Sequence, residues 1–104
     1  MSGPELTVGT SVIAELVRLA ALEVPGVSRV GRGGALWRRV LAGRAVSVRL
    51  RDEQVLVRVW IVARPGQALG PLTTQVRSAV AATVERLLGL DLGSVVVLVD
   101  GVGS

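Results

Sequence analysis

The fold is decided by Arg44–Arg64, which reads RAVSVRLRDEQVLVRVWIVAR. Apolar side chains alternate with polar ones on both sides of the acidic pair Asp52–Glu53, and a period of two is typical of a half-buried strand. The stretch therefore predicts a β-hairpin with one apolar face and one arginine-rich face. The apolar face would carry Val46, Val48, Leu50, Val55, Val57, Val59, Ile61 and Ala63.

Two registers of this hairpin keep its faces matched. A two-residue turn at Asp52–Glu53 pairs Leu50 with Val55, whereas a four-residue turn places Arg49 opposite Arg58. Like charges directly opposite each other cost up to about 1 kcal/mol, which favours the shorter turn. A two-residue turn without glycine is unfavourable, however. The pattern leaves both registers open.

The composition narrows the chemistry that the chain can perform. It contains no histidine, cysteine or lysine, which excludes Ser-His-Asp and Cys-His catalysis, zinc sites with nitrogen or sulfur ligands, and Walker-type phosphate loops. The acids are scattered, and the adjacent pair Asp52–Glu53 falls at the predicted turn, where neighbouring side chains diverge. We therefore expect no enzymatic activity, no metal and no cofactor.

The length of 104 residues is that of one domain. We expect residues 1–104 to form a single domain with a flexible lead-in over residues 1–9. The start lacks a leader pattern and the chain lacks an apolar run of about twenty residues, which predicts a cytoplasmic protein without a transmembrane segment. All twelve cations are arginine, which fits either a thermophile or a GC-rich genome.

Helical periodicity appears on both sides of the hairpin. Val12–Val24 carries an apolar stripe at helical spacing, and Thr10 or Ser11 offers an N-cap oxygen before it. A second helix is expected to open at Gly70–Pro71 and to end at Gly89 in the left-handed conformation.

Two further strands are predicted at Val27–Val30 and Ser94–Asp100. The last strand is apolar on both faces, so it has strands on both sides or an outer face that meets another chain. It can run parallel or antiparallel to its neighbour. The predicted fold is a two-layer α+β domain with a mixed sheet of three to four strands and two helices on one face, in the order helix, short strand, strand, strand, helix, strand.

The segment Gly31–Gly43 has two interpretations. The first is a connecting loop with a short helix whose Trp37 covers part of the core. The second is a basic arm of Trp37, Arg38 and Arg39 that docks on a partner or on an anionic surface.

Three stretches together resemble the alkaline shock protein family, the small envelope stress response proteins of bacteria. They are VIAELVRLAALEVPGVSRV (12–30), RAVSVRLRDEQVLVRVWIVARPG (44–66) and QVRSAVAATVERLLGLDLGSVVVLVDGV (75–102). The resemblance implies a single α+β domain without catalytic residues. It also implies a role in cell-envelope homeostasis, a position at the inner face of the membrane reached through a partner, and self-association.

Positive charge is concentrated around the hairpin. Residues 27–64 carry nine arginines against Asp52 and Glu53, a net charge of +7, so this region attracts anionic partners. We expect the arginine-rich face to bind another protein or a second copy of the chain, because Trp and Arg are enriched in binding hot spots. The candidate partner-binding residues are Arg49, Arg51, Leu56, Arg58, Trp60 and Val62.

Two alternatives compete with this scaffold or adaptor function. The face can be merely solvated, with Trp60 lying under arginine stems. A basic α+β domain can also bind nucleic acid, and Gly31–Gly34 matches the G-x-x-G loop of KH modules. That loop joins two helices in KH modules, however, whereas a predicted strand precedes it here.

Overall fold

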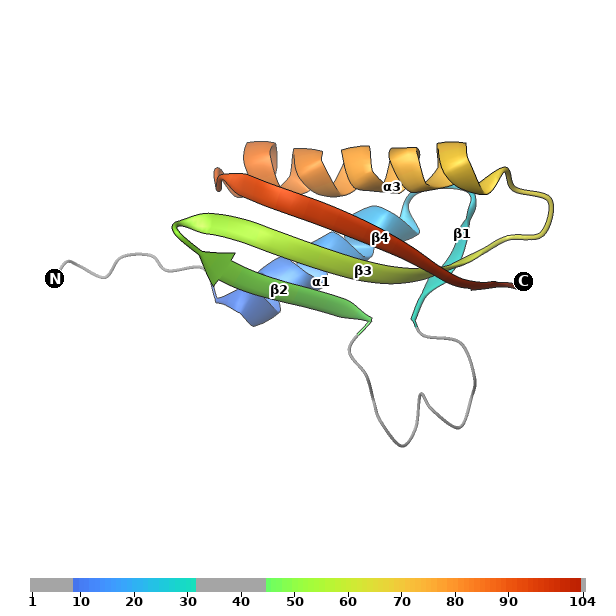
Figure 1. Cartoon of the computed structure of the whole chain (residues 1–104), viewed down its shortest axis with the longest axis horizontal. Helices are drawn as coiled ribbons and strands as arrows, with labels where there is room; N and C mark the ends of the chain where they lie inside the picture. The colour runs from blue at the N-terminus through green and yellow to red at the C-terminus, as the bar shows by residue number, and fades with distance from the viewer. Residues whose placement is uncertain (1–8, 32–44, 104) are drawn as a thin grey trace, which may run out of the picture.

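The computed structural model of the chain describes residues 9–31 and 45–103, which form two helices and a four-stranded sheet (Figure 1). The predicted α+β fold and its element order are confirmed. The elements are α1 (Thr10–Leu22), β1 (Val27–Val30), β2 (Val46–Arg51), β3 (Gln54–Ala63), α3 (Leu69–Ala82) with its π-helical continuation η1 (Thr83–Leu87), and β4 (Leu92–Val102).

Strand β3 is the centre of the sheet, because every other strand pairs with it. Strands β1 and β2 pair with it antiparallel and β4 pairs with it parallel, so the sheet is mixed, as predicted. The Trp60 N–H donates to the carbonyl of Ala45 (2.8 Å), and the Trp60 carbonyl accepts from the N–H of Gly31 (3.0 Å). Strands β1 and β2 therefore lie end to end along one edge of β3, and β4 occupies the other edge.

The hairpin adopts the shorter of its two registers. Leu50 pairs with Val55 and Arg49 with Leu56, so no two arginines lie directly opposite each other. The two-residue turn is made by Asp52 at φ 52° and Glu53 at φ 66°. A turn with both central residues at positive φ matches the twist of the two strands, although glycine or asparagine normally adopts it.

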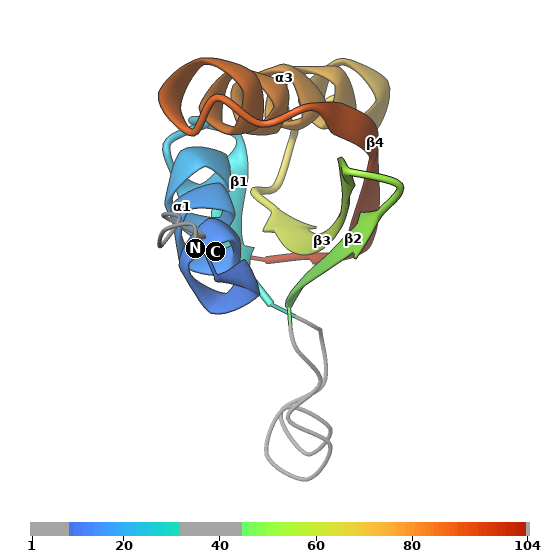
Figure 2. The ribbon, with the colours of Figure 1, turned by 90° about the vertical axis from the view of Figure 1, so that its left-hand side faces the viewer.

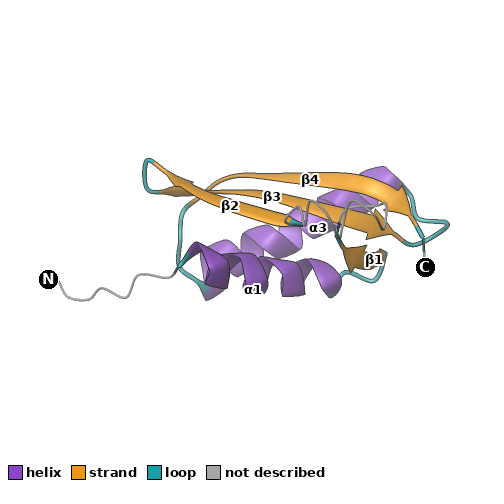
Figure 3. Ribbon diagram, turned by 90° about the horizontal axis from the view of Figure 1, so that it is seen from below, coloured by secondary structure: helices purple, strands orange, loops and turns teal. Residues whose placement is uncertain are grey.

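The core lies between the inner face of the sheet and the two helices, both of which pack on that face (Figure 2, Figure 3). Val57, Val59 and Ile61 of β3 are at most 2% exposed, and they meet Val17 of α1 and Val76 of α3 in one apolar cluster. The alternation along β3 therefore directs one set of side chains into the core, as the pattern predicts.

Helix α1 begins one to two residues earlier than the sequence-based prediction. Its N-cap is Gly9, which has no side chain to cap the helix, so the predicted cap by Thr10 or Ser11 is wrong. The Gly9 carbonyl instead accepts bonds from the N–H groups of Val12 and Ile13. After α1, the chain turns at Pro25–Gly26 into β1.

Helix α3 follows the prediction more closely. Pro71 lies in its first turn, where a missing N–H costs no intrahelical bond. Its continuation η1 widens at the end, because the Leu88 N–H donates to the Thr83 carbonyl five residues earlier (3.1 Å). Gly89 follows at φ 68°, the predicted left-handed position. Among the described residues, no helix has the length and apolar character needed to cross a membrane.

Candidate interaction surface

The sheet face opposite the helices carries the residues that the sequence analysis singled out, and we call it the outer face. Strand alternation places Arg49 and Arg51 of β2 there, together with Leu56, Arg58 and Trp60 of β3. No described element covers this face (Figure 3). The register of β4 adds three residues that sequence reasoning did not assign to the site: Ser94, Val96 and Leu98.

These β4 residues were missed because the pairing of β4 with β3 is not visible in the sequence. The parallel register sets Ser94 beside Leu56, Val96 beside Arg58 and Leu98 beside Trp60. The available signal was that SVVVLVD is apolar on both faces, and the structure explains it. One face of the strand borders the core, and the other extends the outer face.

On the outer face, the charged side chains are more exposed to solvent than most of the apolar ones. The side chains of Arg49, Arg51 and Arg58 are exposed, whereas Leu56 and Trp60 are half-buried. Val96 is 43% exposed, which is large for an apolar side chain in the middle of a strand. The outer face therefore combines cationic groups with accessible apolar surface, the mixture found at binding hot spots.

Leu56 reaches across to β4 and lies over the backbone of Gly93. A Cβ atom added at Gly93 would come within 2.7 Å of Leu56 Cδ2. The missing side chain of Gly93 thus gives Leu56 its half-buried position.

The outer face is hollowed between its strands. A shallow depression of about 180 Å³ is lined by Ser47, Arg49, Leu56, Val57, Arg58, Ser94 and Val96. Pockets for small molecules and cofactors usually measure about 300–1,000 Å³. This depression suits an inserted side chain of another protein better than a cofactor.

Val62 does not belong to the accessible surface, although alternation along β3 assigns it to the outer face. It is only 4% exposed, so the structure removes it from the predicted set of contact residues. The pairing is irregular on both sides of it, between Val27 and Arg29 in β1 and toward the end of β4. Gly103 lies close by, and a Cβ atom placed there would be 3.8 Å from Val62 Cγ1.

The other predicted candidates lie outside the described residues. These are the basic arm of Trp37, Arg38 and Arg39 and the lead-in apart from Gly9. Of the G-x-x-G match, only Gly31 is described, and the element before it is strand β1. The helix that a KH module has before this loop is therefore not present at that position.

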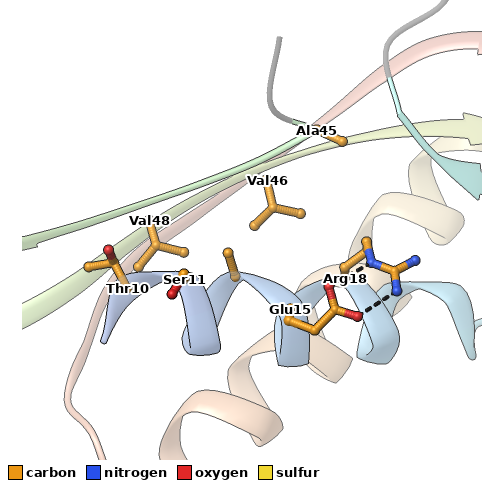
Figure 4. A pocket seen from close by; sticks show the side chains of 8 residues that line it. Thr10, Ser11, Glu15, Arg18, Ala45, Val46 and Val48 are labelled. Carbon is orange, nitrogen blue, oxygen red and sulfur yellow. Dashed lines mark hydrogen bonds and ion pairs between the residues drawn. The ribbon is translucent and has the colours of Figure 1, made fainter. Parts of the chain in front are cut away.

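A second depression lies between α1 and β2 and measures about 350 Å³ (Figure 4). At its rim the Arg18 guanidinium donates to the Glu15 carboxylate at 2.6 and 3.1 Å. This hydrogen bond lowers the pKa of the Glu15 carboxyl and raises the pKa of Arg18. A carboxylate with a lowered pKa is a weaker base than a free one.

No cluster of three or more histidine, cysteine, aspartate or glutamate side chains that could hold a metal ion occurs within residues 9–31 and 45–103.

Comparison with solved structures identifies the same fold in the MamM CTD. A manganese form of one MamM CTD variant is 18% identical to this chain and covers 89% of it and 99% of its own length, with a TM-score of 0.64. A copper form of another variant is 17% identical and covers 89% and 98% of the two chains, with a TM-score of 0.65. At this identity the likeness concerns the fold alone. No curated protein matched the chain.

Comparison with protein families gives a match over nearly the whole length. The model of the alkaline shock protein 23 family, described as having a cell envelope-related function, matches residues 2–104. The resemblance carried by the three sequence stretches is thereby confirmed. The chain belongs to the alkaline shock protein 23 family.

Proposed function

We propose that this protein is a non-catalytic scaffold or adaptor in the envelope stress response of bacteria. It acts through protein–protein contacts and self-association. Its place is the cytoplasm or the inner face of the membrane, which it reaches through a partner. The observation that carries the proposal is the outer face, where exposed Arg49, Arg51 and Arg58 share one side of the sheet with half-buried Leu56 and Trp60 and no described element covers them.

The apolar part of this surface supports a docking role. Leu56, Trp60 and Leu98 are half-buried, and Val96 is 43% exposed, on adjoining strands. Monomers rarely expose large contiguous apolar patches, and burial of apolar area is the main favourable contribution to protein association. A protein that covers this face would gain that contribution.

The charge of the surface supports an acidic docking partner. Arg49 and Arg58 lie on neighbouring strands. Leu56 lies directly opposite Arg49 and Ser47 directly opposite Arg58, so neither arginine faces an acid across the strands. Exposed cations of one sign speed the encounter with an acidic surface, and the effect weakens as salt screens it. Association should therefore slow as the ionic strength rises.

Charge reversal on the outer face tests the proposal. The double variant Arg49→Glu, Arg58→Glu should lose the proteins that the wild-type chain captures from the soluble and membrane fractions of a native lysate. Both side chains are exposed, so the thermal midpoint should change little. The control is Arg77→Glu, Arg86→Glu, which reverses the same number of charges on the helical layer.

The control variant should capture the same proteins as the wild type. Equal capture by the outer-face variant and the wild type, with both chains folded, would remove the outer face from the proposed function.

A further inference from the structure

The second edge of β4 pairs with no described strand, and helix α3 lies next to the strand on that side (Figure 1). Strand β4 spans Leu92–Val102 and pairs only on the side of β3 among the described strands. Proteins usually protect such edges with lysine, proline or short strands, because an open edge can pair with another chain. The middle of β4, SVVVLV, contains no charge and no proline.

The backbone groups that face this edge follow from the hydrogen-bond pattern. Trp60 turns its N–H and C=O toward Ala45 and Gly31, so alternation turns those of Val57, Val59 and Ile61 toward β4. In a parallel pair of strands, a residue whose N–H and C=O bond to the neighbouring strand is paired with a residue whose own N–H and C=O point away from that strand. The β4 partners Val95, Val97 and Val99 therefore direct their N–H and C=O groups to the unpaired edge.

The side chains along this edge are also incompletely covered. Val57 and Val59 are 2% and 0% exposed, whereas their partners Val95 and Val97 on the same face are only half-buried. The core is thus closed over β3 and remains accessible at β4. A strand added beside β4 would extend the sheet and cover these valines.

The sequence of β4 matches its own reverse. Read around Val97, the strand LGSVVVLVDGV sets Gly93 opposite Gly101, Ser94 opposite Asp100, Val95 opposite Val99 and Val96 opposite Leu98. An antiparallel second copy in this register places apolar residues opposite apolar residues and does not place Asp100 opposite itself. All the outward N–H and C=O groups of Val95, Val97 and Val99 find partners, because these residues form the hydrogen-bonded pairs.

We infer that the edge of β4 is a homodimer interface in which two copies pair antiparallel around a twofold axis at Val97. The result is one continuous sheet whose two outer faces lie side by side. This inference rests on the self-association part of the proposed function and assigns it to a surface distinct from the outer face. The symmetry is closed, as in most homodimers.

Val97→Pro tests the interface. Proline removes an N–H that faces away from β3, and such a change is tolerated at the exposed side of an edge strand. In analytical ultracentrifugation, the wild-type protein should have about twice the monomer mass of 10.8 kDa, and Val97→Pro should have the monomer mass. The matched control is Val48→Pro on β2, another half-buried edge valine whose N–H faces away from β3. It should remain dimeric.

Disulfide trapping tests the register, because the chain contains no cysteine. The proposed register makes position 96 of one copy and position 98 of the other a non-hydrogen-bonded pair, with Cα atoms about 4.5 Å apart, which a disulfide can span. An oxidised mixture of the Val96→Cys and Leu98→Cys proteins should cross-link faster than either protein alone. A wild-type monomer, or a mixture that cross-links no faster than its components, would overturn the inference even if Val97→Pro fails to fold.

The outcome also separates this inference from the proposed function. If Val97→Pro is monomeric and Arg49→Glu, Arg58→Glu still dimerises but loses its captured proteins, both stand. If Arg49→Glu, Arg58→Glu becomes monomeric and Val97→Pro stays dimeric, the outer face carries self-association and the edge inference is wrong. If only Val97→Pro affects mass and charge reversal leaves capture unchanged, the edge inference stands and the docking role of the outer face fails.

Discussion

Asp52 and Glu53 hold left-handed backbone conformations at the tip of the hairpin, at φ 52° and φ 66°. Residues other than glycine pay roughly 1–2 kcal/mol in this region, because Cβ approaches the following carbonyl oxygen. The four-residue turn would avoid this cost but would place Arg49 opposite Arg58. The adopted turn keeps these arginines apart and keeps every inner-face valine in register.

Glu53→Gly should therefore stabilise the protein. Aspartate followed by glycine is a preferred sequence for this turn, and relief of the left-handed strain exceeds the extra entropy that glycine loses on folding, for a net gain of about 0.5–1 kcal/mol. Urea unfolding measures the change. The control Glu53→Ala removes the same charge and keeps the strain, so it should not stabilise. Equal effects of both substitutions would show that charge at the turn matters and backbone strain does not.

At Gly26 the exit from α1 passes close to Gln67 and to Leu72 of α3. A Cβ atom there would lie 2.7 Å from Leu72 Cδ1 and would also overlap Gln67. Its carbonyl accepts a bond from the N–H of Arg64 (2.9 Å), and the Arg64 guanidinium donates to the Pro25 carbonyl (3.1 Å). This end of β3 is thus tied to the turn between α1 and β1.

Gly26→Ala should destabilise the protein by about 1–3 kcal/mol, the usual cost of forcing extra volume into a packed site. Gly70→Ala is the matched control, because a Cβ atom at Gly70 meets nothing within 4 Å and alanine favours the helix. Thermal or urea unfolding compares the two variants. A Gly26→Ala protein as stable as Gly70→Ala would mean that Leu72 and Gln67 move aside without cost.

Among the strands, β3 contributes its whole inner face to the core, whereas the turn end of β2 lies outside the core. Ile61 is fully buried in the middle of the sheet, whereas Leu50 on the same inner face is 55% exposed near the turn. The inner face is therefore covered along β3, where Val55 opposite Leu50 is 1% exposed, and uncovered at the turn end of β2. The energetic weight of an inner-face residue should depend on its position along the sheet.

Ile61→Ala should cost about 2–5 kcal/mol, because it removes buried methyl groups and leaves a cavity. Leu50→Ala should cost about 0.5 kcal/mol or less, in the range of surface substitutions. Urea unfolding of both variants provides the comparison. Similar losses for the two would contradict the burial of β3 relative to the hairpin tip.

Periodicity in the sequence predicts most elements because it reports a local property, the side of a strand or helix that is buried. It correctly separates the faces of β2 and β3 up to Ile61 and locates both helices. It fails at Val62, where irregular pairing buries a residue that alternation directs outward. It also leaves open the direction of β4, since a strand after a helix can join its neighbour in either sense, and this is why Ser94, Val96 and Leu98 were missed.

At the scale of the whole molecule, the two layers leave opposite surfaces with different chemistry. The helical layer closes one face of the sheet, and the outer face carries exposed arginines with half-buried Leu56 and Trp60. Family membership indicates a cell envelope-related role. We expect a protein partner to cover this outer face when the protein works.

Radical footprinting of the protein in native extract and as the dilute purified chain tests whether a partner covers the outer face. Each side chain's oxidation reports its accessibility, and Leu69 and Leu87 on the helical layer, 42% and 69% exposed, provide internal references. We predict that Trp60 and Leu56 are protected in the extract while Leu69 and Leu87 react equally in both samples. Equal reactivity of Trp60 and Leu56 in the two samples would contradict the account.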